Sequence, residues 1–201
     1  MIDIKAKEVF RLYLKQFSPL SEQEFEDIFI YFKELKLKKN EYFIKEGQIC
    51  KNVGFIVKGI LRVYYINDKG DDITSCFCPE NSLTTSYKSL ITKTFSTLNI
   101  QALNSVELLI ISHDDFNKIL ISSPAWQHVM RIILQNEYFN MEKYVSVLSN
   151  ETAIEKYKRL LEEQPQIIQI APIQHIASYL GVTRRTLTRI RGDVAKKNSN
   201  I

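Results

Sequence analysis

The sequence contains no run of about eighteen apolar residues, the length that a helix needs to cross a bilayer. Its first residues, MIDIKAKEVFRLYLK, place charges where a secretory signal would need an apolar core. With 45% hydrophobic and 11% aromatic residues, the chain is nevertheless too apolar to be disordered. We therefore expect a globular, cytoplasmic protein that acts without a membrane.

Cysteine is scarce. The chain has three cysteines, Cys50, Cys76 and Cys78, and no CxxC pair. So few thiols, odd in number, exclude a disulfide framework, and the missing CxxC pairs argue against a zinc site. Alternation along ITSCFC places Cys76 and Cys78 on one face of a strand. Two interpretations stay open here: a buried pair of small apolar residues, or a redox-sensing thiol pair.

Catalytic motifs are missing as well. We find no GxSxG, P-loop, HExxH or glycine-rich dinucleotide motif. The three histidines, His113, His128 and His175, fall in separate segments and form no constellation with a nucleophile. The sequence therefore predicts a protein that is not an enzyme.

Helix and strand patterns divide the chain. The first forty residues read as helices, interrupted at SPLSEQE, where Ser21 and Glu24 have the spacing of a capping box. From Glu41 to Ser112, short segments rich in β-branched and aromatic residues alternate with turn residues. Without helix-length connections, such strands predict an antiparallel barrel or jelly roll. Ser112 and Ser123 then mark the starts of two helices.

The second of these helices should run to about Leu148. It carries a heptad seam of apolar residues that predicts a dimer interface: Leu134, Tyr138, Met141, Val145 and Leu148. Other apolar residues surround the same helix: Trp126, Val129, Ile132, Ile133 and Phe139. A helix that is apolar on two faces suits packing on its own β unit and on a second copy. The simpler alternative is that the stripe only packs on the β unit.

The last unit has the pattern of a helix-turn-helix. Ala177 is small where two helices would approach, Gly181 can take a positive φ in the turn, and Thr183 can cap the second helix. From Gly181 to Ile201 there are six basic residues against Asp193 alone, a net charge of +5, whereas the whole chain carries +4. Such a concentration of positive charge is typical of a polyanion-binding surface.

Arginine dominates the second helix. No carboxylate occurs between Gly181 and Gly192, and the guanidinium fork matches guanine O6 and N7 as well as phosphate oxygens. The predicted DNA-binding residues are Thr183, Arg184, Arg185, Thr188, Arg189 and Arg191. Lys196 and Lys197 should either contact the phosphates of the DNA backbone or lie in a frayed end of the helix.

From GFIVKGILRVYYINDKGDDI to IASYLGVTRRTLTRI, the chain resembles transcription regulators of the cyclic-AMP receptor protein and fumarate/nitrate regulator (Crp/Fnr) type. The resemblance implies an α+β fold in three parts: a cyclic-nucleotide-binding-like, double-stranded β-roll sensor domain (1–122), a dimerisation helix (123–149), and a winged-helix or helix-turn-helix DNA-binding domain (150–201). The implied partners are double-stranded DNA with a pseudo-palindromic operator, a second copy of the chain, and RNA polymerase.

The chain departs from the family at two places in this last domain. Many members have glutamate at the position of Arg185, where it accepts a bond from cytosine, and arginine cannot accept. We therefore expect a different operator, with Arg185 on guanine or phosphate. Ten residues follow Arg191, too few for the second hairpin of a wing.

The effector site departs further. The segment matching the family's phosphate cassette contributes Thr84, Thr85, Ser86, Ser96 and Thr97, and no arginine occurs between Arg62 and Arg131. Without a guanidinium for the cyclic phosphate we do not expect cyclic AMP, although Lys88 or Lys93 could act as point charges.

The cofactor stays undetermined. Three cysteines cannot supply the roughly four thiolates of an iron-sulfur cluster, whereas haem on His113 or His128, another small molecule, or no effector remain open. The alternative function is a ligand-sensing signalling module, responding to haem, redox state or another small molecule, whose main output is not DNA binding.

Overall fold

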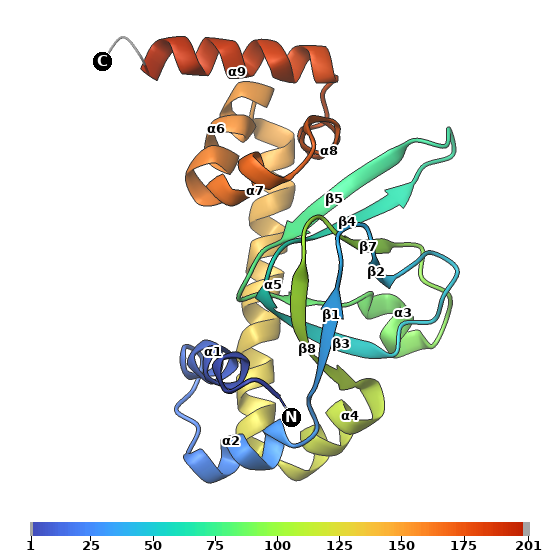
Figure 1. The fold of residues 1–201 in the computed structure, drawn as a ribbon, viewed down its shortest axis with the longest axis vertical. Coiled ribbons are helices and arrows are strands. Elements are labelled where there is room, and N and C mark those ends of the chain that lie inside the picture. Colours follow the sequence, from blue (N-terminus) through green and yellow to red (C-terminus); the bar gives the residue numbers. More distant parts are fainter. Residues whose placement is uncertain (1, 199–201) are drawn as a thin grey trace.

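The computed structural model describes residues 2–198, without the side chains of 143–150 and 197–198. Two antiparallel sheets occupy the middle of the molecule, and the long helix α5 (Pro124–Asn150) runs along one side (Figure 1). The C-terminal helices lie at the end opposite to the N-terminal helices. Among the described residues, no helix is both long and apolar enough to cross a membrane.

The N-terminal segment forms α1 (Ile4–Lys15) and α2 (Glu22–Phe29). The predicted capping box is confirmed, since the Ser21 Oγ accepts a bond from the Glu24 backbone N–H and the Glu24 carboxylate accepts one from the Ser21 N–H. The prediction of helices through residue 40 is wrong beyond α2, because β1 begins at Lys33. Leu35 and Leu37 alternate with charged residues, as in an edge strand. Pairing of β1 with β8 fixes this segment in the strand conformation.

The predicted antiparallel jelly roll is confirmed. One sheet has the order β1-β8-β3-β6 and the other β2-β7-β4-β5, and every pairing is antiparallel. The strands are β1 (Lys33–Leu37), β2 (Tyr42–Ile44), β3 (Asn52–Lys58), β4 (Leu61–Ile66), β5 (Asp72–Cys78), β6 (Leu83–Thr84), β7 (Asn99–Ala102) and β8 (Val106–Ser112). The short helix α3 (Tyr87–Thr92) connects β6 to β7. Apolar side chains between the sheets, such as Ile56, Leu61 and Ile100, form one core.

A second core joins the N-terminal helices, α4 (His113–Ser122) and α5 to the sheet of β3 and β8. Both predicted caps are confirmed, because Ser112 Oγ accepts from the Asp115 N–H and Ser123 Oγ from the Trp126 N–H. Trp126, Val129 and Ile133 are buried in this core, and Ile132 is half-buried. Phe139 is 60% exposed, and its ring packs edge to face on that of Tyr138 on the same helix.

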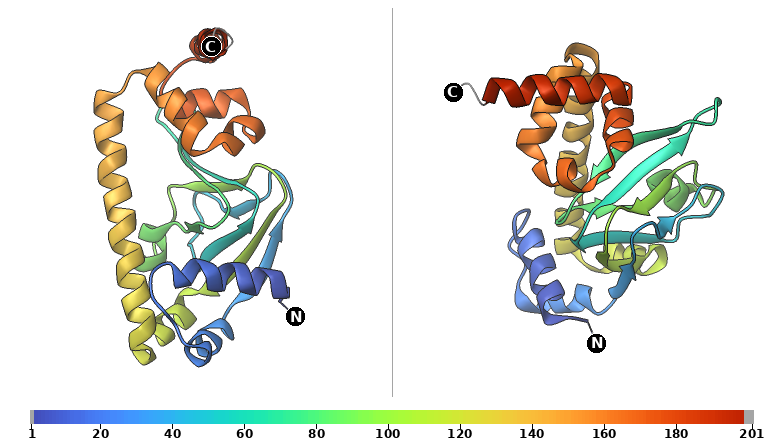
Figure 2. Two further views of the ribbon diagram at one scale, coloured as in Figure 1. Left: turned by 90° about the vertical axis from the view of Figure 1, so that its left-hand side faces the viewer. Right: turned by 45° about the horizontal axis from the view of Figure 1, so that its top comes forward.

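The C-terminal unit consists of α6 (Ala153–Glu163), α7 (Pro165–Ile170), α8 (Ile173–Leu180) and α9 (Arg184–Asn198). They pack around a third core that includes Tyr157, Ile167, Ile176 and Leu187. The winged part of the expected fold class is not found, because residues 151–198 contain helices and no strand. Instead of turning into a hairpin, the chain after Arg191 continues α9 and buries Val194. Two further views show α9 lying across the end of the molecule (Figure 2).

Candidate nucleic-acid interface

A tight turn joins α8 to α9. Gly181 adopts a φ of 69°, a value that favours glycine, and the Val182 N–H donates to the Ala177 carbonyl at 2.9 Å. At the start of α9 the Thr183 Oγ1 accepts from the Thr186 N–H at 3.1 Å. The predicted helix-turn-helix geometry and its threonine cap are therefore present.

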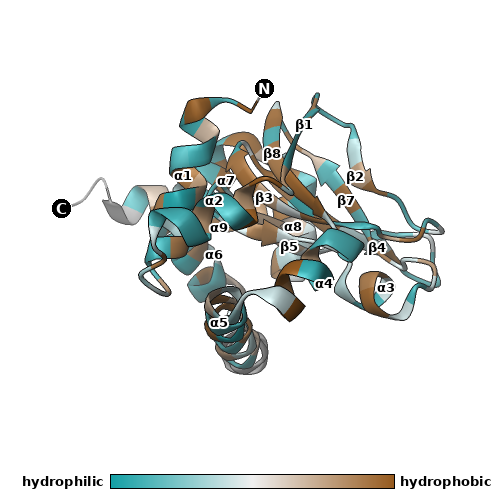
Figure 3. Cartoon of the chain, turned by 90° about the horizontal axis from the view of Figure 1, so that it is seen from below, coloured by the Kyte–Doolittle hydropathy of each residue, from teal (hydrophilic) through white to brown (hydrophobic). Residues whose placement is uncertain are grey.

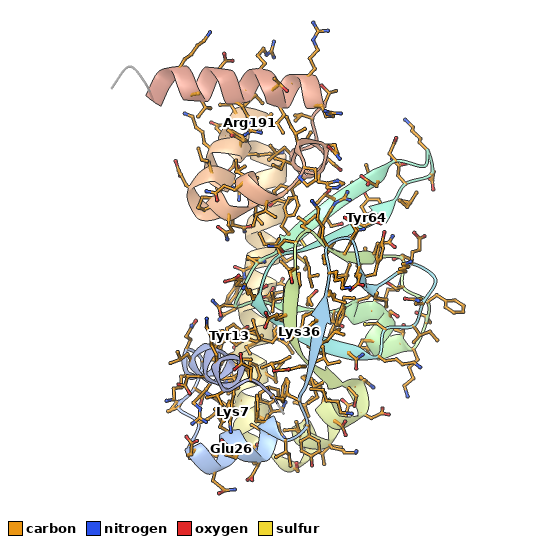
Figure 4. All side chains as sticks on the ribbon, in the orientation of Figure 1. Lys7, Tyr13, Glu26, Lys36, Tyr64 and Arg191 are labelled. Carbon is orange, nitrogen blue, oxygen red and sulfur yellow. The ribbon has the colours of Figure 1, made fainter. Side chains whose placement is uncertain are left out.

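The helix α9 has two distinct faces. Leu187, Ile190 and Val194 are buried against the other C-terminal helices. The residues predicted to bind DNA are all exposed: Thr183, Arg184, Arg185, Thr188, Arg189 and Arg191. Figure 4 shows side chains with nitrogen tips projecting from the outer side of α9, away from the rest of the molecule. Lys196 is exposed on the same helix, and the side chain of Lys197 lies outside the described residues.

The charges of this surface are not neutralised within the chain. None of the four arginines forms an ion pair with another residue that the structure describes, although the Thr188 hydroxyl donates to the Arg184 carbonyl. Arg159 of α6 differs, because it pairs with Glu151 and Glu163. An exposed helix face that carries unpaired guanidinium groups is suited to phosphate and to the edge of guanine.

A second exposed feature lies on α5. Leu134, Tyr138 and Met141 follow the predicted heptad spacing, and 48%, 55% and 59% of these residues are exposed. Seen from below, α5 stands apart from the strands at one side of the molecule (Figure 3). The two other residues predicted for this stripe, Val145 and Leu148, have side chains outside the described residues. The described stripe is thus left uncovered by the chain itself.

Comparison with known proteins agrees with this architecture. Residues 34–123 match the family model of the cyclic nucleotide-binding domain. The solved structure of FixK2 from Bradyrhizobium japonicum superposes with a TM-score of 0.71 at 18% identity, covering 83% of this chain and 86% of that one. The chain has the fold of the Crp/Fnr regulators. No curated protein matches it by sequence.

Two other solved structures with this fold belong to proteins described as regulators. A putative Crp/Fnr-family transcriptional regulator from Eubacterium rectale gives a TM-score of 0.66 at 18% identity, with 89% of this chain and 85% of that one covered. The c-di-GMP-responsive global regulator CLP of Xanthomonas campestris gives 0.69 at 11% identity, with 89% and 93% covered. The similarity extends over the C-terminal helices as well as the β-roll.

In the β-roll, several residues of the segment predicted to hold an effector form hydrogen bonds within the protein. Ser86 and Ser96 are buried, and their hydroxyls lie 2.9 Å apart. Thr85 donates to the Asn52 carbonyl at 3.0 Å. Thr84 is buried at the end of β6, whereas Thr97 is exposed and does not join the others. The structure thus brings two of the five residues into direct contact.

The histidines considered for haem contact their own helices. In α4 the His113 ring lies 3.1 Å from the Asn117 amide nitrogen, and in α5 the exposed His128 lies 3.2 Å from the Arg131 guanidinium. Because His113 belongs to α4 and His128 to α5, the two histidines lie on different helices.

The thiols of Cys76 and Cys78 interact on β5, and neither cysteine is fully buried. A hydrogen bond from the Cys78 thiol lowers the pKa of Cys76, and the same bond together with burial raises the pKa of Cys78 well above its usual value. The charge of Glu137 on α5 raises both pKa values. The interpretation as a buried apolar pair is therefore wrong, because Cys76 is exposed.

One group of polar residues has no counterpart in the sequence analysis. Arg62 of β4 is 1% exposed, and its guanidinium pairs with Asp72 at 2.8 Å and donates to Thr74 Oγ1 at 2.9 Å. Ser178 of α8 accepts from the Thr74 N–H at 2.9 Å and donates to the Asp72 carbonyl at 3.1 Å. We call these four residues the domain seam, because they join the β-roll to the helix-turn-helix.

Aromatic packing extends the domain seam. Phe77 of β5 and Tyr179 of α8 meet edge to face at 5.4 Å. His175 lies nearby on α8, where burial and then the charge of Arg62 lower its pKa, and Asp72 partly opposes them. Its buried Nδ1 has no partner among the described residues. The sequence signal was an arginine inside the apolar strand LRVYYI, ten residues before an aspartate.

Proposed function

We propose that this chain is a homodimeric, sequence-specific DNA-binding transcriptional regulator of the Crp/Fnr type, active in the cytoplasm and not an enzyme. The observation that carries the proposal is the exposed face of α9, on which four arginines have no ion-pair partner among the described residues. This face belongs to the second helix of a helix-turn-helix, the element that reads the major groove in such units.

The exposed stripe on α5 supports the dimer. Burying Leu134, Tyr138 and Met141 against a second copy would remove their apolar surface from water. Twofold symmetry would then place two copies of α9 in successive major grooves, about 34 Å apart. The operator is expected to be an inverted repeat.

Within α9 we assign base and phosphate contacts to Arg184 and Arg189, with Arg185 on guanine or phosphate. Thr183 lies at the positive end of the helix dipole, where backbone N–H groups favour a phosphate. The remaining residues of the surface, Thr188 and Arg191, would contact the groove or its backbone.

The deciding experiment is selection from random duplex DNA by the purified chain, followed by affinity measurements across a salt series. We expect an inverted repeat whose half-site differs from the TGTGA type, with binding that weakens steeply as salt rises. Arg184→Ala and Arg189→Ala should each cost about 1–3 kcal/mol, or roughly ten- to hundredfold in affinity.

A matched control is Lys5→Ala with Lys15→Ala, which removes two exposed positive charges from α1 at the opposite end of the molecule (Figure 1). This control should keep the affinity of the unmodified chain. Enrichment of no sequence, with equal binding by the arginine variants, would favour the ligand-sensing signalling module instead. Recovery of TGTGA half-sites would overturn the role given to Arg185.

A further inference from the structure

The connection from β6 to β7 carries exposed apolar side chains, outside the predicted DNA-binding face of α9 and the stripe of α5. Tyr87 and Ile91 lie about one helical turn apart on the outer face of α3, and Phe95 follows shortly after this helix. Ile49 of the β2–β3 loop forms a β-bridge with Phe95, which places the two residues side by side. With 70% of Phe95 and 57% of Tyr87 exposed, these residues form one apolar surface that we call the α3 patch.

Hydrogen bonds between its two segments hold the α3 patch together. The Gly47 N–H donates to the Ser96 carbonyl at 2.9 Å, and the Ser96 N–H donates to the Gln48 carbonyl at 2.8 Å. The Cys50 N–H donates to the buried Ser89 Oγ of α3 at 2.9 Å. Because these backbone groups are already paired, a partner cannot add a β-strand through them and must contact side chains instead.

An open groove lies beside the α3 patch. Its volume is about 540 Å³, and its walls include Ile49 and Phe95 of the patch together with Phe43 and Ile44. A recess with apolar walls can receive a bulky side chain of a partner, whereas a flat surface cannot. The α3 patch thus combines exposed apolar anchors with an adjoining recess.

Positive charge borders the α3 patch. Lys51, Lys88 and Lys93 are exposed, and none of them forms an ion pair within the part of the chain that the structure describes. The segments that build the patch, 47–52 and 81–106, contain no aspartate or glutamate. A partner with carboxylates around an apolar face would therefore meet opposite charges at this border.

We propose that the α3 patch and its groove bind an acidic amphipathic helix of another protein. The apolar face of that helix would cover the patch, and its carboxylates would meet the bordering lysines. A second copy of the chain fits less well, because a twofold contact would bring the same lysines of both copies together. The bordering lysines are also fewer than the roughly four to eight basic residues typical of lipid-binding clusters.

This proposal goes beyond DNA binding and does not depend on it. Figure 1 shows α3 at the side of the β-roll and α9 at one end of the molecule. A helix bound at the α3 patch would therefore leave the predicted DNA-binding face uncovered. Both ligands are expected to bind at the same time.

The test is selection from a phage-displayed library of randomised helical peptides on the immobilised full-length chain. Peptides that also bind the double variant Ile91→Asp with Phe95→Asp are removed by counter-selection. We expect the enriched peptides to be acidic and to carry apolar residues at helical spacing along one face. Circular dichroism checks that the double variant is folded, and both changed side chains are exposed in the unmodified chain.

Fluorescence anisotropy then measures the affinity of one enriched peptide. Phe95→Ala and Ile91→Ala should each weaken its binding at least about tenfold, because each removes an apolar anchor. Lys51→Ala with Lys88→Ala should weaken the binding more at low salt than at high salt, since salt screens the charges that these lysines supply.

Ile121→Ala on α4 removes an exposed apolar side chain outside the α3 patch, and this matched control should retain the affinity for the peptide. Every variant should keep whatever affinity for DNA the unmodified chain has, so failure of this proposal is distinct from failure of the proposed function. The proposal is overturned if no acidic helix is enriched, or if the patch variants bind the peptide as tightly as the unmodified chain does.

Two further outcomes would assign the α3 patch to another occupant and would also overturn the proposal. Loss of the dimer in Ile91→Asp with Phe95→Asp, measured by sedimentation velocity, would show that a second copy covers the patch. Binding of the unmodified chain, but not of this variant, to vesicles that contain phosphatidylserine would show that the patch contacts a membrane.

Discussion

At the scale of single residues, Arg62 is a charged side chain buried in the β-roll. It is almost fully buried, so its charge needs a partner, and Asp72 supplies it together with Thr74. The guanidinium also lies 4.3 Å from the centre of the Tyr64 ring. A charge taken out of water is tolerated here because each side of the guanidinium meets an acceptor or an aromatic face.

Asp72→Asn should therefore destabilise the chain by about 2 kcal/mol, since it leaves a buried cation with a weaker acceptor. The value lies below that of a fully buried pair because the side chain of Asp72 is 43% exposed. Urea denaturation measures the difference. Asp68→Asn, in the exposed turn of the same hairpin, should leave the stability unchanged, and an equal loss in both variants would refute the assignment.

The same pair predicts a pH dependence. Hydrogen bonding from Arg62 lowers the pKa of Asp72 below its ordinary 3.8. A carboxyl group whose pKa is lowered in the folded chain contributes stability at a pH above its ordinary pKa. This contribution is lost as the pH falls below that value. The stability difference between Asp72→Asn and the unmodified chain should consequently shrink below about pH 4.

At the scale of elements, α5 shows how one helix can serve two environments. Trp126, Val129 and Ile133 pack on the β-roll, whereas Leu134 and Tyr138 face away from it. Because the buried and the exposed apolar residues of α5 face different surroundings, they do not fall on one stripe. The exposed part has the spacing of a coiled-coil seam.

If the proposed dimer forms through this stripe, Leu134→Glu with Tyr138→Glu should convert it into a monomer. Each substitution removes an apolar contact worth about 2 kcal/mol, so the dissociation constant should rise by roughly a hundredfold or more. Sedimentation velocity measures the effect. Ile121→Glu on α4 changes an apolar side chain that is 83% exposed outside the stripe, and it should leave the association unchanged. A chain that is monomeric before any substitution would refute the interface.

At the scale of the whole molecule, the domain seam holds the helix-turn-helix against the β-roll. Ser178 satisfies two backbone groups of β5, and its helix buries apolar side chains beside Phe77. The orientation of α9 is consequently coupled to the β4–β5 hairpin. A ligand that favours one position of this hairpin would favour one position of α9.

Acidification should loosen the domain seam. The lowered pKa of His175 means that its neutral form is favoured in the folded chain, so stability is full above about pH 6.5 and is lost as the pH falls below it. The protection of the Thr74 amide against hydrogen exchange, corrected for intrinsic rates, should decrease from pH 7.5 to pH 5.5.

His175→Gln cannot titrate, and this variant should lose less protection over the same range. His128→Gln, which removes an exposed histidine of α5, serves as the matched control and should behave like the unmodified chain. An equal pH dependence in all three proteins would show that His175 does not act at the seam.

The sequence by itself determined the features that depend on neighbours along the chain. The caps at Ser21, Ser112 and Ser123, the turn at Gly181 and the two faces of α9 follow from local hydrogen bonding and from helical periodicity. Only the tertiary structure decided the strand at Lys33–Leu37, the pairing of Arg62 with Asp72, and the contact of Ser178 with β5. These features rest on partners that are distant in the sequence, and short-range patterns carry no information about which distant segments meet.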